Sequence, residues 1–240
     1  MHQKSFPAER YLVATGEASI SGRKVEIVDL SDPTKNCYKL DDISYRYASA
    51  GGLLEGHPVI CGGVGALRDC IVFGSSQNVA FEMKQSRRHF SAVSLNSSML
   101  WLLGSDTGHT AVQSTEFISL RQGKGPLTST DGPYMPFRLG YSCVVKFNDT
   151  TIYILGGVQS GSTTNRVWIA SISDKITFNQ GPSMVYKRSF HACGTISVGN
   201  KNLIVVAGGN GRLSSRSMEI LDPSVNLWVE EGTFYLQGGC

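Results

Sequence analysis

Short apolar runs that end in glycine recur along the chain at intervals of about fifty residues. The runs are LVATG, VICGG, LWLLG, IYILGG and LIVVAGG, and their last glycines are Gly16, Gly63, Gly104, Gly157 and Gly209. The intervals between these glycines are 47, 41, 53 and 52 residues. A period of roughly 20 to 50 residues is typical of solenoids, arrays and propellers, so the pattern predicts a repeat architecture.

Each repeat contains four short apolar segments separated by turns. A first segment such as YSCVVKF or HACGTISV precedes the glycine run, and short polar turns at 148–150 and 199–200 separate the two. After the glycines come a polar loop and a third segment: VEIVDL, TEFISL, RVWIASI or SMEILDP. A fourth, weaker segment is clearest at 227–229. Four short strands in meander order without helical periodicity favour propeller blades over a sandwich.

The last complete unit resembles a known repeat family. GGNGRLSSRSMEILDPSVNLW, from Gly208 to Trp228, is similar to the kelch repeat, with its glycine pair, polar loop, strand ending in an acidic turn, and tryptophan. Glycine pairs also occur at 62/63 and 156/157, whereas the first and third units have Thr-Gly and Leu-Gly instead. The resemblance implies an all-β, kelch-type β-propeller of four-stranded blades with divergent repeats. We expect a single kelch β-propeller domain over residues 11–236, with residues 1–10 as an N-terminal extension.

The number of blades leaves two alternatives open. The chain contains about five repeats, and the first begins at what should be a second strand, so this blade is expected to lack its inner strand. Propellers usually close by pairing strands from both termini, and the segment Phe234–Leu236 is short for that role. Either a five-bladed ring closes imperfectly, or the chain is a fragment of a six-bladed propeller, which we favour.

The six cysteines bear on the compartment. Cys143 and Cys193 occupy matching places on the first strands of successive units, and we expect both to be free thiols packed in the core. Cys37, Cys61 and Cys70 lie close in sequence, and their disulfide state stays open. Asn-x-Ser/Thr patterns at 96–98 and 148–150 are glycosylation acceptor motifs. The expected location is cytoplasmic, and the alternative is extracellular.

Charge and hydropathy exclude two classes of partner. The chain has 22 basic and 19 acidic residues, a net charge of +3, which is far from the concentrated positive field that nucleic-acid binding needs. No stretch approaches the roughly 18 to 20 consecutive apolar residues that span a bilayer. We therefore expect neither nucleic acid nor membrane as a partner.

Motifs for enzymatic chemistry are missing from the sequence. The five histidines show no close HxxxH pair, and the chain contains no CxxC, GxxxxGK[ST] or GxSxG motif. We expect no metal, no cofactor and no enzymatic activity. A site assembled from distant loops escapes such a scan, so a kelch-like oxidase or sugar isomerase stays a less favoured alternative.

The most informative recurrence is basic. An arginine stands just before the first strand of four units, in YRYAS, RRHFS, PFRLG and KRSFH. Loops that enter the first strands and loops that follow the glycines share one face of a meander blade, so we predict a polar, partly basic binding face there. At any single arginine, packing between blades is the favoured alternative. The predicted partner-binding residues are Arg46, Arg88, Arg138, Arg188, Gln159, Asn165, Asn210, Arg212 and Arg216.

These observations together predict a protein-interaction module that binds a protein or peptide segment, with an acidic segment as the best fit. The kelch resemblance implies roles as a substrate receptor or scaffold within a larger protein. The alternative is a secreted kelch recognition protein.

Overall fold

The computed structural model describes residues 11–15, 25–29, 38–40, 46–73, 78–106, 111–120, 127–211 and 213–233. The chain divides into two compact units. Unit 1 comprises residues 1–107 and 114–132, and unit 2 comprises residues 108–113 and 133–240. Each unit is described by itself below.

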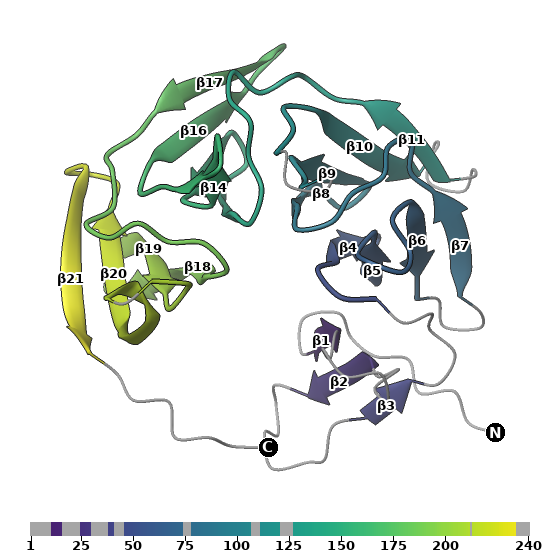
Figure 1. Ribbon diagram of the computed structural model, residues 1–240, viewed down its shortest axis with the longest axis horizontal. Coiled ribbons are helices and arrows are strands. Elements are labelled where there is room, and N and C mark those ends of the chain that lie inside the picture. Colours follow the sequence, from purple (N-terminus) through teal and green to yellow (C-terminus); the bar gives the residue numbers. More distant parts are fainter. Residues whose placement is uncertain are drawn as a thin grey trace. The chain divides into compact units, whose positions relative to one another are not determined.

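Unit 1 contains one three-stranded and two four-stranded antiparallel sheets, each with its strands in sequence order (Figure 1). The three-stranded sheet is formed by β1 (Tyr11–Thr15), β2 (Val25–Asp29) and β3 (Tyr38–Leu40). The next sheet is formed by β4 (Ala50–Leu54), β5 (His57–Cys61), β6 (Asp69–Val72) and β7 (Val79–Glu82). The last is formed by β8 (Ser91–Asn96), β9 (Met99–Leu103), β10 (Thr115–Leu120) and β11 (Leu127–Asp131).

Unit 2 contains two further four-stranded antiparallel sheets and a small hairpin. One sheet is formed by β12 (Cys143–Asn148), β13 (Thr151–Leu155), β16 (Val167–Ile172) and β17 (Ile176–Gln180). The hairpin between its second and third strands is formed by β14 (Val158–Gln159) and β15 (Ser162–Thr163). The other sheet is formed by β18 (Ala192–Val198), β19 (Lys201–Ala207), β20 (Ser217–Asp222) and β21 (Leu227–Thr233), with a 3₁₀ turn at Ser214–Arg216.

The four four-stranded meanders confirm the predicted all-β fold built from β-propeller blades. In three of the four-stranded sheets the second strand, β5, β9 or β13, is the most buried, because its apolar run is covered on both faces. In β9 and β13 only the first residue of each strand is less than fully buried. A continuous apolar run is typical of a strand buried on both faces.

The described residues include no helix with the length and apolar character of a membrane span.

Glycine pairs after the second strands allow neighbouring chain segments to approach closely. Gly156 and Gly157 have φ angles of +58° and +92°, which favour glycine. A Cβ atom on Gly156 would lie 2.6 Å from the Arg188 carbonyl oxygen, and one on Gly157 would lie 2.5 Å from that of Gly140. The pair therefore lets the segments that enter β12 and β18 pass directly against the end of β13.

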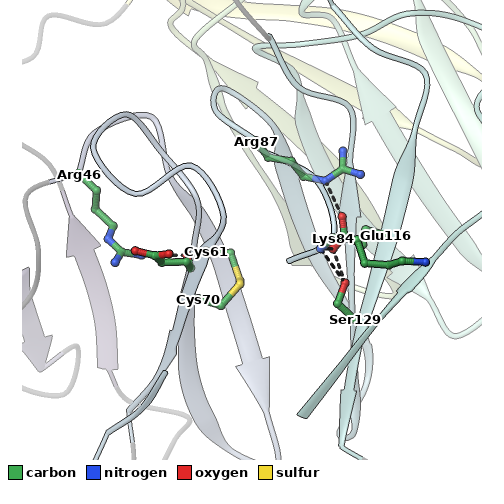
Figure 2. The surroundings of a disulfide bond; sticks show 8 residues. Arg46, Cys61, Cys70, Lys84, Arg87, Glu116 and Ser129 are labelled. Atoms are coloured by element: carbon green, nitrogen blue, oxygen red, sulfur yellow. Dashed lines mark hydrogen bonds and ion pairs between the residues drawn. A yellow bond between two sulfur atoms is a disulfide. The ribbon is translucent and has the colours of Figure 1, made fainter. Parts of the chain in front are cut away.

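Two disulfide bonds correct or extend the expectations for cysteine. Cys143 on β12 and Cys193 on β18 are bonded, with Cα atoms 5.9 Å apart, so the prediction that they are free thiols was wrong. Cys143 and Cys193 follow the positive-φ residues Tyr141 and Phe190 by two and three residues, so their positions in the two blades differ by one. The bond forms because the first strands of the two blades, β12 and β18, pack against each other. Cys61 and Cys70, directly opposite each other on β5 and β6, form the second bridge (Figure 2). Cys37 lies outside the described residues.

Candidate binding face

The two ends of each blade differ in the chain segments that they present. Because the strands alternate in direction, the turns between first and second and between third and fourth strands share one end, called here the turn end. The loop between second and third strands shares the other end with the connection that enters the first strand. We call this second end the loop end. In unit 2 its described residues lie in the segments 133–142, 156–166, 181–191 and 208–216, without residue 212.

Arg188, predicted as a partner-binding residue, lies inside its blade. Its side chain is fully buried, and its Nε atom donates to Glu219 Oε1 at 2.9 Å. Its Nη1 atom donates to the carbonyl oxygens of Gly208, Ser214 and Ser217 at 2.6, 2.9 and 3.0 Å. Glu219 also accepts bonds from the backbone N–H groups at 185 and 186, which precede β18. The ion pair therefore ties the entering connection to β20 and the loop before it.

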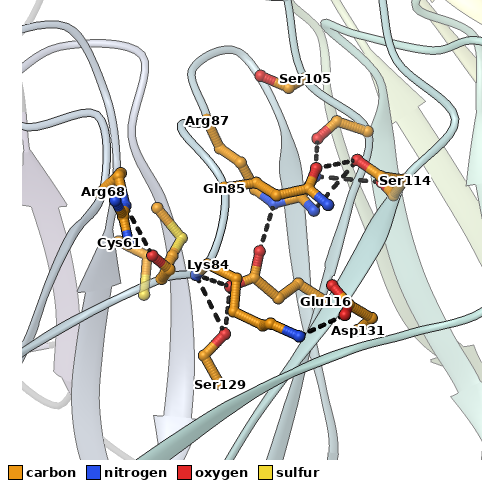
Figure 3. A network of polar contacts seen from close by, with 12 residues as sticks. Cys61, Arg68, Lys84, Gln85, Arg87, Ser105, Ser114, Glu116, Ser129 and Asp131 are labelled. Carbon is orange, nitrogen blue, oxygen red and sulfur yellow. Dashed lines mark hydrogen bonds and ion pairs between the residues drawn. The ribbon is translucent and has the colours of Figure 1, made fainter.

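Arg87 and Glu116 repeat this arrangement in unit 1 (Figure 3). Both side chains are buried, with Arg87 Nε 3.3 Å from Glu116 Oε2, and Arg87 Nη1 donates to the carbonyl oxygens of Gly104 and Ser114 at 2.7 and 3.1 Å. Burial lowers the pKa of Arg87, and the charge of Glu116 opposes this shift. Glu116 also accepts from the backbone N–H of Lys84, as Glu219 does from its entering connection.

The equivalent arginine in that blade is thus Arg87 and not the predicted Arg88. Each four-stranded blade has a non-glycine residue with positive φ just before its first strand, at Ala48, His89, Tyr141 and Phe190. Arg87 and Arg188 both lie two residues before this residue, which defines the equivalent position in every blade. The equivalent positions are therefore Arg46, Arg87, Leu139 and Arg188. The sequence prediction had placed Arg46, Arg88, Arg138 and Arg188 at equivalent positions. Two of these residues, Arg88 and Arg138, are each one residue away from the equivalent position, because the sequence alignment matched arginine with arginine.

The two predicted arginines of unit 1, Arg46 and Arg88, also contact the backbone. Arg46 is buried and donates from Nη1 to the Asp69 carbonyl oxygen at 3.2 Å, and burial lowers its pKa against the opposing charge of Asp69. Arg88 is partly buried and donates from Nε to the Asp106 carbonyl oxygen at 2.9 Å. These contacts match the packing alternative that the sequence left open.

Exposed cations gather instead at the loop end of unit 2. Arg138, predicted from the sequence, is exposed, and its Nη1 atom lies 3.5 Å from the Ala111 carbonyl oxygen. Arg166, which was not predicted, is exposed and donates to Gln159 Oε1 at 3.4 Å. Four exposed residues share this end and are called here the basic set: Arg138, Arg166, Lys187 and Arg216.

Acidic residues are absent from the chain segments that carry the basic set. The four segments that form the loop end of unit 2 contain no aspartate or glutamate. Asp149, Asp174 and Asp222 lie at the turn end of the same blades, and Glu219 is paired with Arg188. Among the described residues, no member of the basic set has an ion-pair partner. The four loop-end segments themselves therefore carry only positive charges on their side chains.

The remaining predicted residues of this end differ in their accessibility. Asn210 is exposed, and Gln159 is partly buried beside Arg166. Asn165 donates from Nδ2 to the Met184 carbonyl oxygen at 2.7 Å, so its amide joins two blades, as Arg68 does through the Met83 carbonyl in unit 1. Arg212 lies outside the described residues. A partner-binding role for these residues stays a prediction.

Two aromatic residues add an apolar element that sequence reasoning missed. The ring centroids of Tyr141 and Phe190 are 4.4 Å apart, and residue Phe190 is 59% exposed. Both have positive φ, which is unusual for bulky residues and holds them in the connections that enter β12 and β18. The signal available in the sequence was an aromatic residue two positions before Cys143 in LGYSC and three positions before Cys193 in SFHAC.

His191 follows Phe190 in the chain, and its ring packs against Gly156. A Cβ atom on Gly156 would lie 2.9 Å from its ring, and both ring nitrogens are buried. Burial, and secondarily the Arg188 charge, lower the pKa of His191 to about 4, and the Leu155 backbone opposes the shift. In unit 1 the ring of Phe90 takes the same place against Gly62. The imidazole is therefore neutral at pH 7 and acts as an aromatic packing group.

The described residues contain no group of three or more His, Cys, Asp or Glu side chains that could hold a metal ion. No protein-family model matches the chain, and no curated protein matches it. Among solved structures, the chain is similar to a fungal alcohol oxidase of the AA5 family in complex with copper. The TM-score is 0.58 at 11% sequence identity, and the match covers 88% of this chain and 59% of the oxidase chain. At this identity the likeness shows the fold alone, a β-propeller.

Proposed function

We propose that this protein is an interaction module whose unit 2 binds an acidic segment of a partner protein at its loop end. The observation that carries the proposal is the basic set, four exposed cations on an end whose segments contain no acidic residue. Guanidinium groups make charge-assisted, often bidentate bonds to carboxylates and phosphates. Such bonds contribute about 1.5 to 3 kcal/mol each where they are desolvated.

The surroundings of the basic set support a protein partner. The exposed Phe190 ring contacts Tyr141 at a tilt of 49° at the same end and offers an apolar contact beside the charges. Aromatic and arginine side chains are enriched among residues that dominate protein interfaces. The blades hold the aromatic and the basic side chains in place, so this protein loses little conformational entropy when the partner binds.

The kelch-type assignment is part of this proposal. Glycine pairs that admit the neighbouring blade's connection, and Trp228, whose Nε1 donates to the Pro182 carbonyl at 2.8 Å, support it. The two disulfides favour an oxidising compartment, because such bonds are rare in the reducing cytosol. We therefore propose an extracellular recognition protein in preference to an intracellular receptor or scaffold.

The proposal is tested by measuring binding of the full chain to an immobilised glutamate-rich peptide and to a phosphoserine peptide. R138A/R166A should weaken capture at least tenfold, and rising salt should weaken wild-type binding, since screening at about 0.1 M ionic strength acts over roughly 10 Å. The matched control is K175A/K201A, which removes two cations from the turn end of unit 2. Equal affinity of the wild type and R138A/R166A, or equal losses in both double variants, would contradict the proposal.

The oxidase alternative rests on the fold likeness to the fungal enzyme. The described residues offer no ligand cluster that fits copper, so we derive no step through a metal. Titration of the full chain with Cu(II), followed by electron paramagnetic resonance, checks this alternative. A stoichiometric copper signal with nitrogen ligands would favour it over the binding module.

A further inference from the structure

Two hairpin turns carry the same three-residue pattern in the same geometry. Asn96 ends β8 and Asn148 ends β12, and both are exposed. In each hairpin the pairing register shifts just before the asparagine, and the asparagine then faces the first residue of the next strand, Met99 or Thr151. The other first turns of four-stranded blades, at 55–56 and 199–200, lack this pattern. Two different blades therefore place an Asn-x-Ser/Thr motif at the same register position of the turn end.

The side chains of both motifs make the same contacts. Asn96 Oδ1 accepts from the Ser98 N–H at 2.9 Å and from Ser98 Oγ at 3.1 Å. Asn148 Oδ1 accepts from the Thr150 N–H at 3.0 Å and from Thr150 Oγ1 at 3.1 Å. The amide nitrogen Nδ2 has no hydrogen-bond acceptor among the described residues at either site. Each turn thus holds its hydroxyl against the amide oxygen and leaves the amide nitrogen at the surface.

Turn stability alone does not explain the choice of asparagine. In the β20–β21 turn, Asp222 Oδ1 accepts from the Ser224 N–H and Oγ at 3.0 and 2.5 Å, the same arrangement with a carboxylate. Aspartate and asparagine both form such turns through the side-chain oxygen. The feature that Asn96 and Asn148 add is an exposed primary amide two residues before a hydroxyl. Among the ten asparagines of the chain, only these two have Ser or Thr at the second following position.

The geometry points to Asn96 and Asn148 as N-glycosylation sites. The donor is an oligosaccharide linked to a lipid diphosphate, and the acceptor motif is Asn-x-Ser/Thr. A bond forms between Nδ2 and the anomeric carbon of the sugar as the bond from that carbon to the diphosphate oxygen breaks. The lipid diphosphate leaves, and the amide proton passes to a base. No oxidant or reductant is needed.

Both glycans would stand on the turn ends of their blades. The proposed partner site of unit 2 lies on the loop end, so a glycan on Asn148 leaves the basic set accessible. The two disulfides and these two motifs agree on one requirement, passage through an oxidising secretory compartment. The inference does not depend on an acidic partner, because the motif, exposure and turn geometry are independent of the basic set.

The test uses the full chain behind a cleavable signal peptide, translated in the presence of microsomes that contain the transferase and its lipid-linked donor. The protease-protected chain is analysed by intact mass before and after amidase treatment. The wild type should carry two glycans, N96D and N148D one each, and the double variant none. Because aspartate keeps the turn, as at Asp222, these variants should melt within about 2 °C of the unglycosylated wild type.

Hydroxyl variants separate the motif from the asparagine alone. T150A should lose the glycan at Asn148 although the asparagine stays, whereas T150S should keep it. N202T creates a new motif at Asn200 in the β18–β19 turn and should add a third glycan. A protease-protected wild-type chain without glycans at Asn96 and Asn148, with Asn200 modified in N202T, would overturn the inference.

Discussion

The sulfur atoms of Cys143 and Cys193 join the first strands of two successive blades in unit 2, with the Cα atoms 5.9 Å apart. Their sequence separation is 50 residues, so the bond closes a loop that contains one complete blade. The Cys61–Cys70 bond has a sequence separation of 9 and joins adjacent strands of one blade. The two bonds therefore constrain the unfolded chain to different degrees.

The first prediction concerns these two bonds. In the chain-entropy model, closing a 50-residue loop stabilises the fold by about 4 kcal/mol and closing a 9-residue loop by about 3 kcal/mol. C143S/C193S should therefore lower the free energy of unfolding more than C61S/C70S, measured by chemical denaturation under non-reducing conditions. Native alkylation followed by mass spectrometry provides the control, since neither pair should react. Rapid labelling of Cys143 and Cys193 in the wild type would show that the bond does not form.

A second prediction compares two adjacent arginines. Arg87 is buried against Glu116, whereas Arg88 is only partly buried and donates to one backbone carbonyl. Removing one partner of a buried pair leaves the other charge uncompensated, which costs about 3 to 5 kcal/mol. R87A should therefore unfold far more readily than R88A in thermal and denaturant melts. R188A should behave like R87A, and R138A should match the wild type.

One outcome would contradict the assignment of Arg87, rather than Arg88, to the equivalent position of its blade. If R88A lost stability and R87A did not, the blade alignment through the positive-φ residues would be wrong. R87K gives a graded control, because lysine keeps the charge but lacks the planar fork that contacts both Glu116 and the carbonyl oxygens. We expect R87K to lie between R87A and the wild type.

The strands could be predicted from the sequence because their signals are local. In the four-stranded sheets the glycine-ended runs became second strands, and TEFISL, RVWIASI and SMEILDP gave third strands at β10, β16 and β20. In the three-stranded sheet, LVATG and VEIVDL gave β1 and β2. Equivalence between blades could not be predicted at single-residue precision. The segment RRHFS offers two arginines, and the positive φ of His89 that identifies Arg87 has no sequence signature. In FRLG the equivalent residue is Leu139, so a search by residue type selects its neighbour Arg138.

Only part of the candidate binding site could be predicted from the sequence, because some of its features depend on contacts between distant residues. The absence of acidic residues from the loops of unit 2 can be read directly from the sequence, and it would have identified Arg166 and Lys187. The burial of Arg188 could not be read there, because it depends on Glu219, which lies 31 residues further along the chain. The Cys143–Cys193 bond has the same origin, since it depends on how two separate blades lie against each other.

The final prediction concerns acid stability and His191. Its pKa in the folded protein is about 4, against an ordinary value of 6.5, so the unfolded chain takes up a proton at a pH where the folded chain does not. Stability is therefore unaffected above pH 6.5 and falls as the pH drops from 6.5 towards 4, by about 3 kcal/mol in total. Protonation of Asp222, whose pKa is about 2, lowers stability only at pH values below the range from 6.5 to 4. His89 also has a lowered pKa and contributes in the same direction, so a variant must isolate His191.

H191F places a phenyl ring where unit 1 has Phe90. Denaturant melts from pH 7.5 to 4 should show that stability declines less steeply with acid in H191F than in the wild type, with closely similar stability at pH 7.5. Identical pH profiles for the two proteins would show that the imidazole reaches water in the folded state, and that its burial over Gly156 is wrong.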